Sequence, residues 1–278
     1  VADADADVVF ADKHFSEQDH YWWPRRFYRV CDKRPPAPSR MFRNQYDQDV
    51  LTWSPQGRIH QVEYAMEAVK QGGAAVGCKN ADYVVLATLK RAASELSSSQ
   101  RKLFKIDDNV GIAISGLTAD GTAATKALRG DCITHKFTFE SQVDVGRLAA
   151  RVADKSQINT QRAGSRPSGV GMLIAGIDEQ GCHLYQTCPS GNLYNHLAAA
   201  IGARSQASKT YLEKNVGKLE GLSLDELVIL ALRALKEASA DPISEKTCSV
   251  AVVGKDTPFR LLESDDLSTI LEGLAEMD

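Results

Sequence analysis

The 278-residue chain lacks the cysteine pairs that mark a disulfide framework or a zinc site. None of its six cysteines belongs to a Cys-x-x-Cys pair. They are scattered along the chain at Cys31, Cys78, Cys132, Cys182, Cys188 and Cys248. Most lie in apolar, strand-like segments, a distribution typical of reduced and buried thiols in an intracellular protein.

The sequence also lacks an excess of basic residues and a long apolar run. Its formal net charge is -3, whereas binding to nucleic acid needs a concentrated basic surface that neutralises phosphates. No apolar run approaches the roughly 18 residues that span a bilayer. We therefore expect neither nucleic acid nor a membrane as a partner.

Sequence motifs of cofactor and metal sites are missing as well. There is no P-loop, no Gly-x-Ser-x-Gly elbow and no His-Glu-x-x-His. Residues 169–171 begin like a dinucleotide fingerprint, but Ile174 stands where the third glycine belongs. The histidines, among them His60 and His183, occur singly, so we expect structural or surface roles for them, no metal and no organic cofactor.

The segment that organises the chain is residues 46–70. Pro55 and Gly57 predict a tight turn, because proline fixes φ and glycine accepts a positive φ. An amphipathic helix follows, with apolar residues from Ile59 to Val69 at steps of three and four. We expect Gly72 to end this helix as a left-handed C′ residue. A helix of about three turns needs its apolar stripe buried against something else.

Apolar segments separated by short polar turns predict strands paired as hairpins. They lie at 75–79, 83–89, 103–106, 110–114, 170–177, 182–186, 248–254 and 258–262. Helices are expected at 118–134, 143–156, 205–216, 224–238 and 266–275, with Ser223 and Glu226 forming a capping box at the start of the fourth. Hairpins indicate antiparallel sheets, and near-continuous apolar strands indicate sheets covered on both faces. We therefore predict a four-layer α/β/β/α sandwich of two antiparallel sheets.

Residues 1–40 differ from the rest of the chain. They show no sustained periodicity and end in a proline-rich stretch. We interpret them as a disordered or artefactual extension, with Met41 as the candidate true start. The main domain is then expected over 41–278.

The stretch 46–70, together with blocks at 115–120, 166–176 and 201–206, closely resembles the alpha subunits of the 20S proteasome. The resemblance covers essentially residues 42–276, and its details are most similar to the eukaryotic type-1 kind, which occupies the sixth position of the alpha ring. It implies the N-terminal-nucleophile hydrolase fold with an added N-terminal helix. Within 41–278, it implies a gate segment at 41–57 and a signature helix at 58–71.

This fold also occurs in catalytic beta subunits, in which a processed threonine attacks the peptide bond with the help of a lysine and an acid. Aligned with them, this chain has Gly73 at the nucleophile position, Leu89 at the acid position and Ala203 at the helper-serine position. Only the lysine, Lys102, remains. We therefore predict a non-catalytic subunit with no catalytic residues.

The resemblance assigns two other sites. The lysine matching Lys102, with positions matching Gly72 and Leu117, lines a pocket that receives the C-terminal carboxylate of activator tails. The tails of alpha subunits close the axial pore, and a cluster matching Tyr46, Asp47, Pro55 and Tyr64 stabilises the open gate.

One departure lies in the gate segment, where Gln48 replaces the arginine that many alpha subunits carry. Glutamine keeps hydrogen-bonding capacity but loses the charge and the guanidinium fork.

The resemblance implies a structural and gating subunit of the outer ring. Its expected partners are other alpha subunits at the fifth and seventh positions, beta-ring subunits, regulatory particles or other activators through their C-terminal tails, and unfolded polypeptides in transit. Its expected location is the cytoplasm and nucleus. A stand-alone binding protein of the same fold and a diverged hydrolase remain as alternatives.

Overall fold

The computed structural model describes residues 46–90, 96, 100–239, 243–244, 247–262, 266–268 and 270. These belong to a compact unit that spans Met41–Asp278. The predictions for residues 1–40, for Met41 and for the last turns of the C-terminal helix fall outside the described residues.

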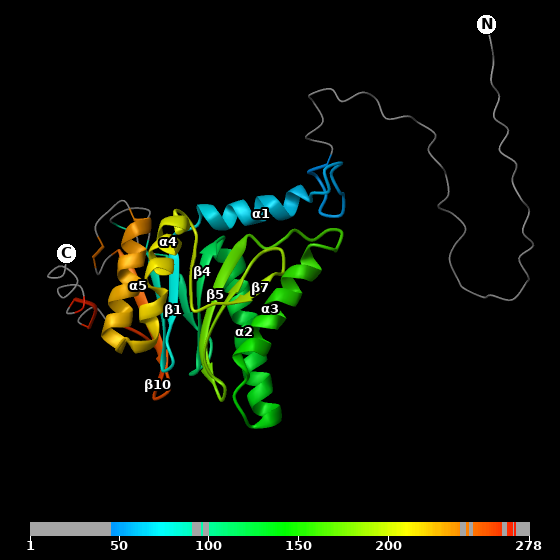
Figure 1. Ribbon diagram of the computed structural model, residues 1–278. Helices are drawn as coiled ribbons and strands as arrows, with labels where there is room; N and C mark the ends of the chain where they lie inside the picture. The colour runs from blue at the N-terminus through cyan, green and yellow to red at the C-terminus, as the bar shows by residue number, and fades with distance from the viewer. Residues whose placement is uncertain are drawn as a thin grey trace, which may run out of the picture. The chain divides into compact units, whose positions relative to one another are not determined.

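Two five-stranded antiparallel sheets form the centre of this unit (Figure 1). The first has the order β10-β9-β2-β1-β8 and the second the order β3-β4-β5-β6-β7. The strands of the first sheet are β1 (Ala75–Lys79), β2 (Tyr83–Leu89), β8 (Ala198–Ile201), β9 (Cys248–Gly254) and β10 (Thr257–Leu261). Those of the second are β3 (Leu103–Lys105), β4 (Val110–Gly116), β5 (Val170–Asp178), β6 (Gly181–Thr187) and β7 (Leu193–Asn195).

Helix pairs cover the outer faces of the sheets, and α1 (His60–Gln71) lies across one end of the strands (Figure 1). On the first sheet lie α4 (Ser205–Asn215), the 3-10 helix η2 (Val216–Gly221) and α5 (Leu224–Ala238). On the second lie α2 (Thr118–Phe139) and α3 (Val145–Asn159). The predicted α/β/β/α sandwich is confirmed.

The alternation of side chains along each strand divides the core into three layers. In β2, Val84 and Leu86 point between the sheets, while Val85 and Ala87 pack under α5. In the second sheet, Leu173 points between the sheets and Ile174 packs under α2 and α3. Both faces of each sheet are therefore buried, which explains the near-continuous apolar strands.

Local signals in the sequence account for most of the element boundaries. The paired strands β1 and β2 match the predicted ranges, and the Ser223–Glu226 capping box forms. The described part of the C-terminal segment is helical at 266–268 and 270.

Some elements differ from the sequence prediction. The strands β7 and β8 and the helix η2 were not predicted, and α2 continues to Phe139 rather than ending at 134. The last turns of α2 expose Ile133, Phe137 and Phe139, so the burial periodicity that reveals a helix is missing there.

The described cysteines are free thiols. Burial raises the pKa of the Cys78 thiol to about 12, so it stays protonated. In the described part of the chain, no helix has both the length and the apolar character needed to cross a membrane.

Candidate functional site

The predicted turn before α1 forms, and it is held by hydrogen bonds of Ser54. The Gly57 amide donates to the Ser54 carbonyl at 2.9 Å, and the Arg58 amide donates to the Ser54 hydroxyl oxygen at 3.1 Å. Gly57 adopts a φ of 73°, as the prediction required. Pro55 lies in this turn and is exposed.

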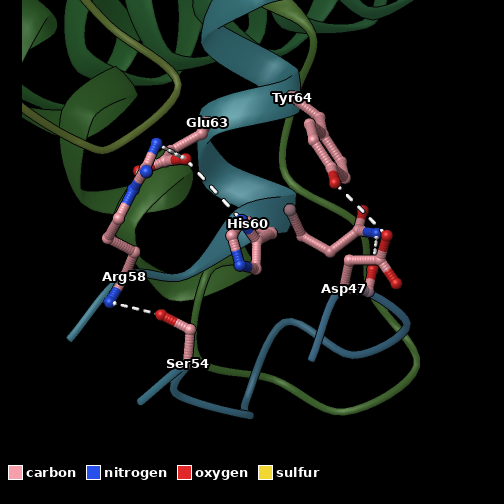
Figure 2. Close-up of polar contacts among 7 residues, drawn as sticks. Asp47, Ser54, Arg58, His60, Glu63 and Tyr64 are labelled. Carbon is pink, nitrogen blue, oxygen red and sulfur yellow. Dashed lines mark hydrogen bonds and ion pairs between the residues drawn. The ribbon is translucent and has the colours of Figure 1, made fainter. Parts of the chain in front are cut away.

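Arg58 and Glu63 then fix the first turn of α1 (Figure 2). The guanidinium donates from Nε and Nη2 to the two carboxylate oxygens, each at 2.6 Å. This hydrogen-bonded pair raises the pKa of Arg58 and lowers that of Glu63. The sequence prediction missed the pair, although an acid in the first turn of a helix is a recognisable signal.

A second contact ties the lead segment, residues 46–58, to α1. The Tyr64 hydroxyl donates to Asp47 Oδ2 at 3.2 Å, and the Gln61 side-chain amide donates to the Asp47 carbonyl (Figure 2). The structure thus brings together two members of the predicted gate cluster, Asp47 and Tyr64. Tyr46 is half-buried beside Asp47. The role of Gln61 was not predicted.

At the other end of α1, close backbone packing forms a glycine junction, which we define as Gly72, Gly73, Gly116, Gly169 and Gly202. A Cβ added at Gly72 would overlap the Gly116 amide and the Ser115 hydroxyl. The prediction that Gly72 is left-handed is wrong: its φ is -62° and its ψ is 158°. Glycine is needed here because two backbones approach closely, not because of the sign of φ.

Ser115 links α1 to this junction. Its side chain is buried, and its hydroxyl lies 3.1 Å from both the Val69 and the Gly73 carbonyl oxygens. The single hydroxyl proton is shared between these two acceptors. The last turn of α1 and the start of β1 are therefore held by one side chain, which the sequence prediction did not single out.

Lys102 fills the space beside Gly73. The residue is only 8% exposed, and its ammonium donates to the Leu89 carbonyl at 2.9 Å. A Cβ added at Gly73 would overlap this ammonium. The Ala203 amide donates to the Gly72 carbonyl at 2.8 Å, so all four positions that were compared with a catalytic site converge on the junction.

Leu117 lies at the rim of the same junction. It is 49% exposed, and its amide donates to the Gly169 carbonyl at 2.9 Å. Its side chain lies against Gly169, where a Cβ would overlap it. The three residues predicted for a tail pocket, Lys102, Gly72 and Leu117, are therefore assembled around one place.

The chemistry available at this place is that of a buried cation among backbone carbonyls. Gly73 offers no hydroxyl or thiol, and the Leu89 side chain cannot accept a proton. The Ser115 hydroxyl faces two carbonyl oxygens rather than a base. In the described residues, no three His, Cys, Asp or Glu side chains are grouped as a metal site would require.

A sandwich of two antiparallel sheets between helix pairs, with a lysine beside the start of β1, is the architecture of proteasome-type subunits. The model of the proteasome subunit family matches residues 69–253, and the model of the N-terminal signature of A-type proteasome subunits matches residues 46–68. The chain belongs to the proteasome alpha-subunit family.

Curated relatives agree with this assignment. The alpha type-1 proteasome subunit of Dictyostelium discoideum is 52% identical over 83% of this chain and 94% of its own length. The Drosophila melanogaster protein of the same description is 48% identical over 81% of this chain and 83% of its own. A probable alpha type-6 proteasome subunit of Schizosaccharomyces pombe is 45% identical over 85% and 88%. The chain is thus a proteasome alpha subunit similar to type-1 relatives.

Proposed function

We propose that this chain is a non-catalytic structural and gating subunit in the outer ring of the 20S proteasome. The observation that carries the proposal is the contact between Gly73 and Lys102. The nucleophile position has no side chain, and the lysine ammonium fills the space in which one would begin. Membership of the alpha family supports the same conclusion.

Within this proposal, the lead segment acts at the gate. The Asp47–Tyr64 hydrogen bond and the turn containing Pro55 give it a defined path into α1. Tyr46, which precedes Asp47 in the chain, is half-buried. Gln48 is exposed and carries no charge, so this subunit supplies no arginine fork to a neighbouring tail at that position.

The glycine junction and Lys102 serve activator docking. A chain-terminal carboxylate is attracted to an ammonium in a desolvated crevice, where charge-assisted hydrogen bonds are strong. Leu117 at the rim offers half-exposed apolar surface to the side chains of the tail. Gly72 allows the end of α1 to pack closely against Gly116 and so fixes the backbone beside Lys102.

The partners that follow are neighbouring alpha subunits at the fifth and seventh positions, beta-ring subunits, activator tails and unfolded polypeptides in transit. The chain would take the sixth position of the ring and act in the cytoplasm and nucleus in ubiquitin-dependent and ubiquitin-independent degradation. The apolar residues that α1 leaves exposed, Tyr64 and Met66, support contact with neighbours.

Native mass spectrometry of particles purified from the source tests the assembly. We expect the chain in a particle that contains both alpha and beta subunits. A free monomer would contradict the proposal and favour a stand-alone binding protein of the same fold. Peptide cleavage by the purified chain that is lost in Lys102→Ala would favour a diverged hydrolase instead.

Activator docking is tested in assembled particles with Lys102→Met, which keeps the volume of the side chain and removes its charge. We expect weaker activator-stimulated peptide hydrolysis with normal assembly. Lys126→Met, at an exposed position on α2, is the matched control. Unchanged activator affinity in Lys102→Met particles would contradict the proposal that Lys102 receives activator tails.

The gate is tested with Tyr64→Phe, which removes only the hydroxyl that donates to Asp47. We expect a change in the ratio of activator-stimulated to basal hydrolysis. The variant Tyr211→Phe, on α4, is the control. An unchanged ratio would contradict the role of this cluster.

A further inference from the structure

A groove separates α2 from α3 on the outer face of the second sheet. It encloses about 400 Å³, and neither the lead segment nor Lys102 lines it. Ligand pockets in proteins commonly have volumes of roughly 300–1,000 Å³ and apolar linings with a few polar groups. The size of this groove suits a small organic molecule.

The apolar lining of the groove combines Leu128 and Met172 with several short side chains. Ala123, Ala124 and Ala127 line it from α2, and Val152 and Met172 line it from α3 and β5. Alanine methyl groups cannot reach across to the facing helix, so the two helices leave space between them. An apolar body can enter this space and displace water from it.

The carboxylates that line the groove are already paired. Arg166 donates to Asp120 with two hydrogen bonds of 2.7 and 2.8 Å, and Arg151 lies 3.3 Å from Asp131. The Gly169 amide also donates to Asp120 at 2.9 Å, and together with Arg166 it lowers the pKa of this carboxyl group. Neither carboxylate therefore presents an uncompensated negative charge to a ligand.

In contrast to these carboxylates, one lysine that lines the groove is unpaired within the ranges that the structure describes. Lys155 lines it from α3 and has no ion-pair partner among the described residues. Asn159 and Ser168 line the same region, and the described part of the chain supplies no hydrogen-bond partner to either side chain. One ammonium, one amide and the hydroxyl groups of Ser168 and Ser165, which also lines the groove, thus remain for an anion.

We propose that the α2–α3 groove binds a small monocarboxylate with a compact apolar body. The carboxylate pairs with Lys155 and accepts hydrogen bonds from Asn159 and Ser168, while the body lies on the alanines above Met172. The charge pattern selects the sign of the ligand, and the short side chains set its size. This site is independent of the proposed gating function.

The test uses the full chain labelled with ¹³C at its methionine methyl groups and titrated with 4-phenylbutyrate. The Met172 methyl group lines the groove, whereas Met66 lies on α1 and serves as an internal reference. We expect a saturable shift of the Met172 signal, with a Kd of about 1 mM or tighter for so small a ligand. The Met66 signal should not move.

Two control ligands test whether binding requires the negative charge of the carboxylate. 4-Phenylbutanol has the same apolar body without charge, and 4-phenylbutylamine carries the opposite charge. We expect each to bind about tenfold more weakly or worse than the carboxylate, as loss of a charge-assisted hydrogen bond predicts. Equal binding of all three would overturn the assignment of a carboxylate.

Two variants, each with a matched control, test the roles of Lys155 and of the alanine lining. Lys155→Gln should weaken 4-phenylbutyrate binding about tenfold, whereas Lys126→Gln, on an exposed part of α2, should not. Ala124→Leu should block the groove, whereas Ala119→Leu, exposed outside the groove, should not. Thermal unfolding of each variant verifies that the chain is folded.

A Met172 signal that stays unchanged throughout the titration would overturn the proposal. So would a signal that moves only when another proteasome subunit is added, because the groove would then be a site for a protein segment.

Discussion

The two ends of α1 are held in place in different ways. At its start, the lead segment is fixed by exposed polar contacts: the Arg58–Glu63 ion pair and the Asp47–Tyr64 hydrogen bond. At its end, the glycine junction is fixed by backbone packing around buried Ser115 and Lys102.

Exposed polar contacts are weak and can be exchanged for contacts with water, whereas close packing leaves no alternative arrangement. One end of the helix can therefore rearrange, and the other is a fixed anchor.

The strongest test of this contrast is Gly72→Ala. The new methyl group would overlap backbone atoms of Gly116, so we expect a loss of about 3 kcal/mol or more in the free energy of unfolding, or failure to fold. Gly57→Ala places a methyl group in open space and costs only about 1 kcal/mol for its positive φ. Urea unfolding measures both. Equal losses would refute the contrast.

A double-mutant cycle at Gly73 and Lys102 gives the next largest effect. Gly73→Ala alone should destabilise the chain by about 1–2 kcal/mol, because the ammonium must move away from the methyl group and give up its hydrogen bond to the Leu89 carbonyl. In a Lys102→Ala background the same change should cost about 1 kcal/mol less, since the space is then empty. Additive losses in urea unfolding would show that the two side-chain positions do not compete.

Asp120, at the rim of the junction, is neither as exposed as the contacts at the start of α1 nor as closely packed as the glycines at its end. Its carboxylate is 17% exposed and accepts hydrogen bonds from Arg166 and from the Gly169 amide. We expect Asp120→Asn to cost about 1 kcal/mol near neutral pH.

The pH dependence of this loss has a definite sign. Arg166 holds the folded-state pKa of Asp120 below the ordinary value of 3.8, so the stabilisation is present above that value and is lost as the pH falls through the folded-state pKa. The difference between wild type and Asp120→Asn should therefore shrink below about pH 4. A difference that is constant between pH 6 and pH 3 would contradict the role of this charge.

The smallest effect is expected at the start of α1. Both members of the Arg58–Glu63 pair are exposed, so Glu63→Gln should change thermal stability only slightly, and less at high salt. A melting temperature as low as that of Gly72→Ala would reverse the comparison. Glu67→Gln, which affects the exposed Lys70–Glu67 pair at the other end of the same helix, is the matched control.

Much of the fold could be predicted because its strands and helices carry strong local signals. The strands β1 and β2 have continuous apolar residues on either side of a turn, and α5 starts with a capping box. The strand β8 was missed because its sequence is three alanines and an isoleucine, which favour no strand by themselves. It forms because it pairs with β1, and such pairing is not a local property.

The candidate site was predicted only in part. The sequence showed that Gly72 follows α1, but it could not distinguish a need for positive φ from a need for close approach. Ser115 was missed because a single serine at the end of a strand has no distinguishing pattern. Its importance arises from two carbonyl groups that are distant in sequence and that the fold brings together.

The packing of Lys102 against Gly73 also limits which residues position 73 can accept. A residue with a side chain at position 73 is opposed by the lysine, and loss of the lysine leaves the Leu89 carbonyl without that donor. We expect either substitution alone to lower the free energy of unfolding, so a side chain at position 73 requires a second change at position 102. A single substitution therefore cannot place a nucleophilic side chain at position 73 without disturbing this packing.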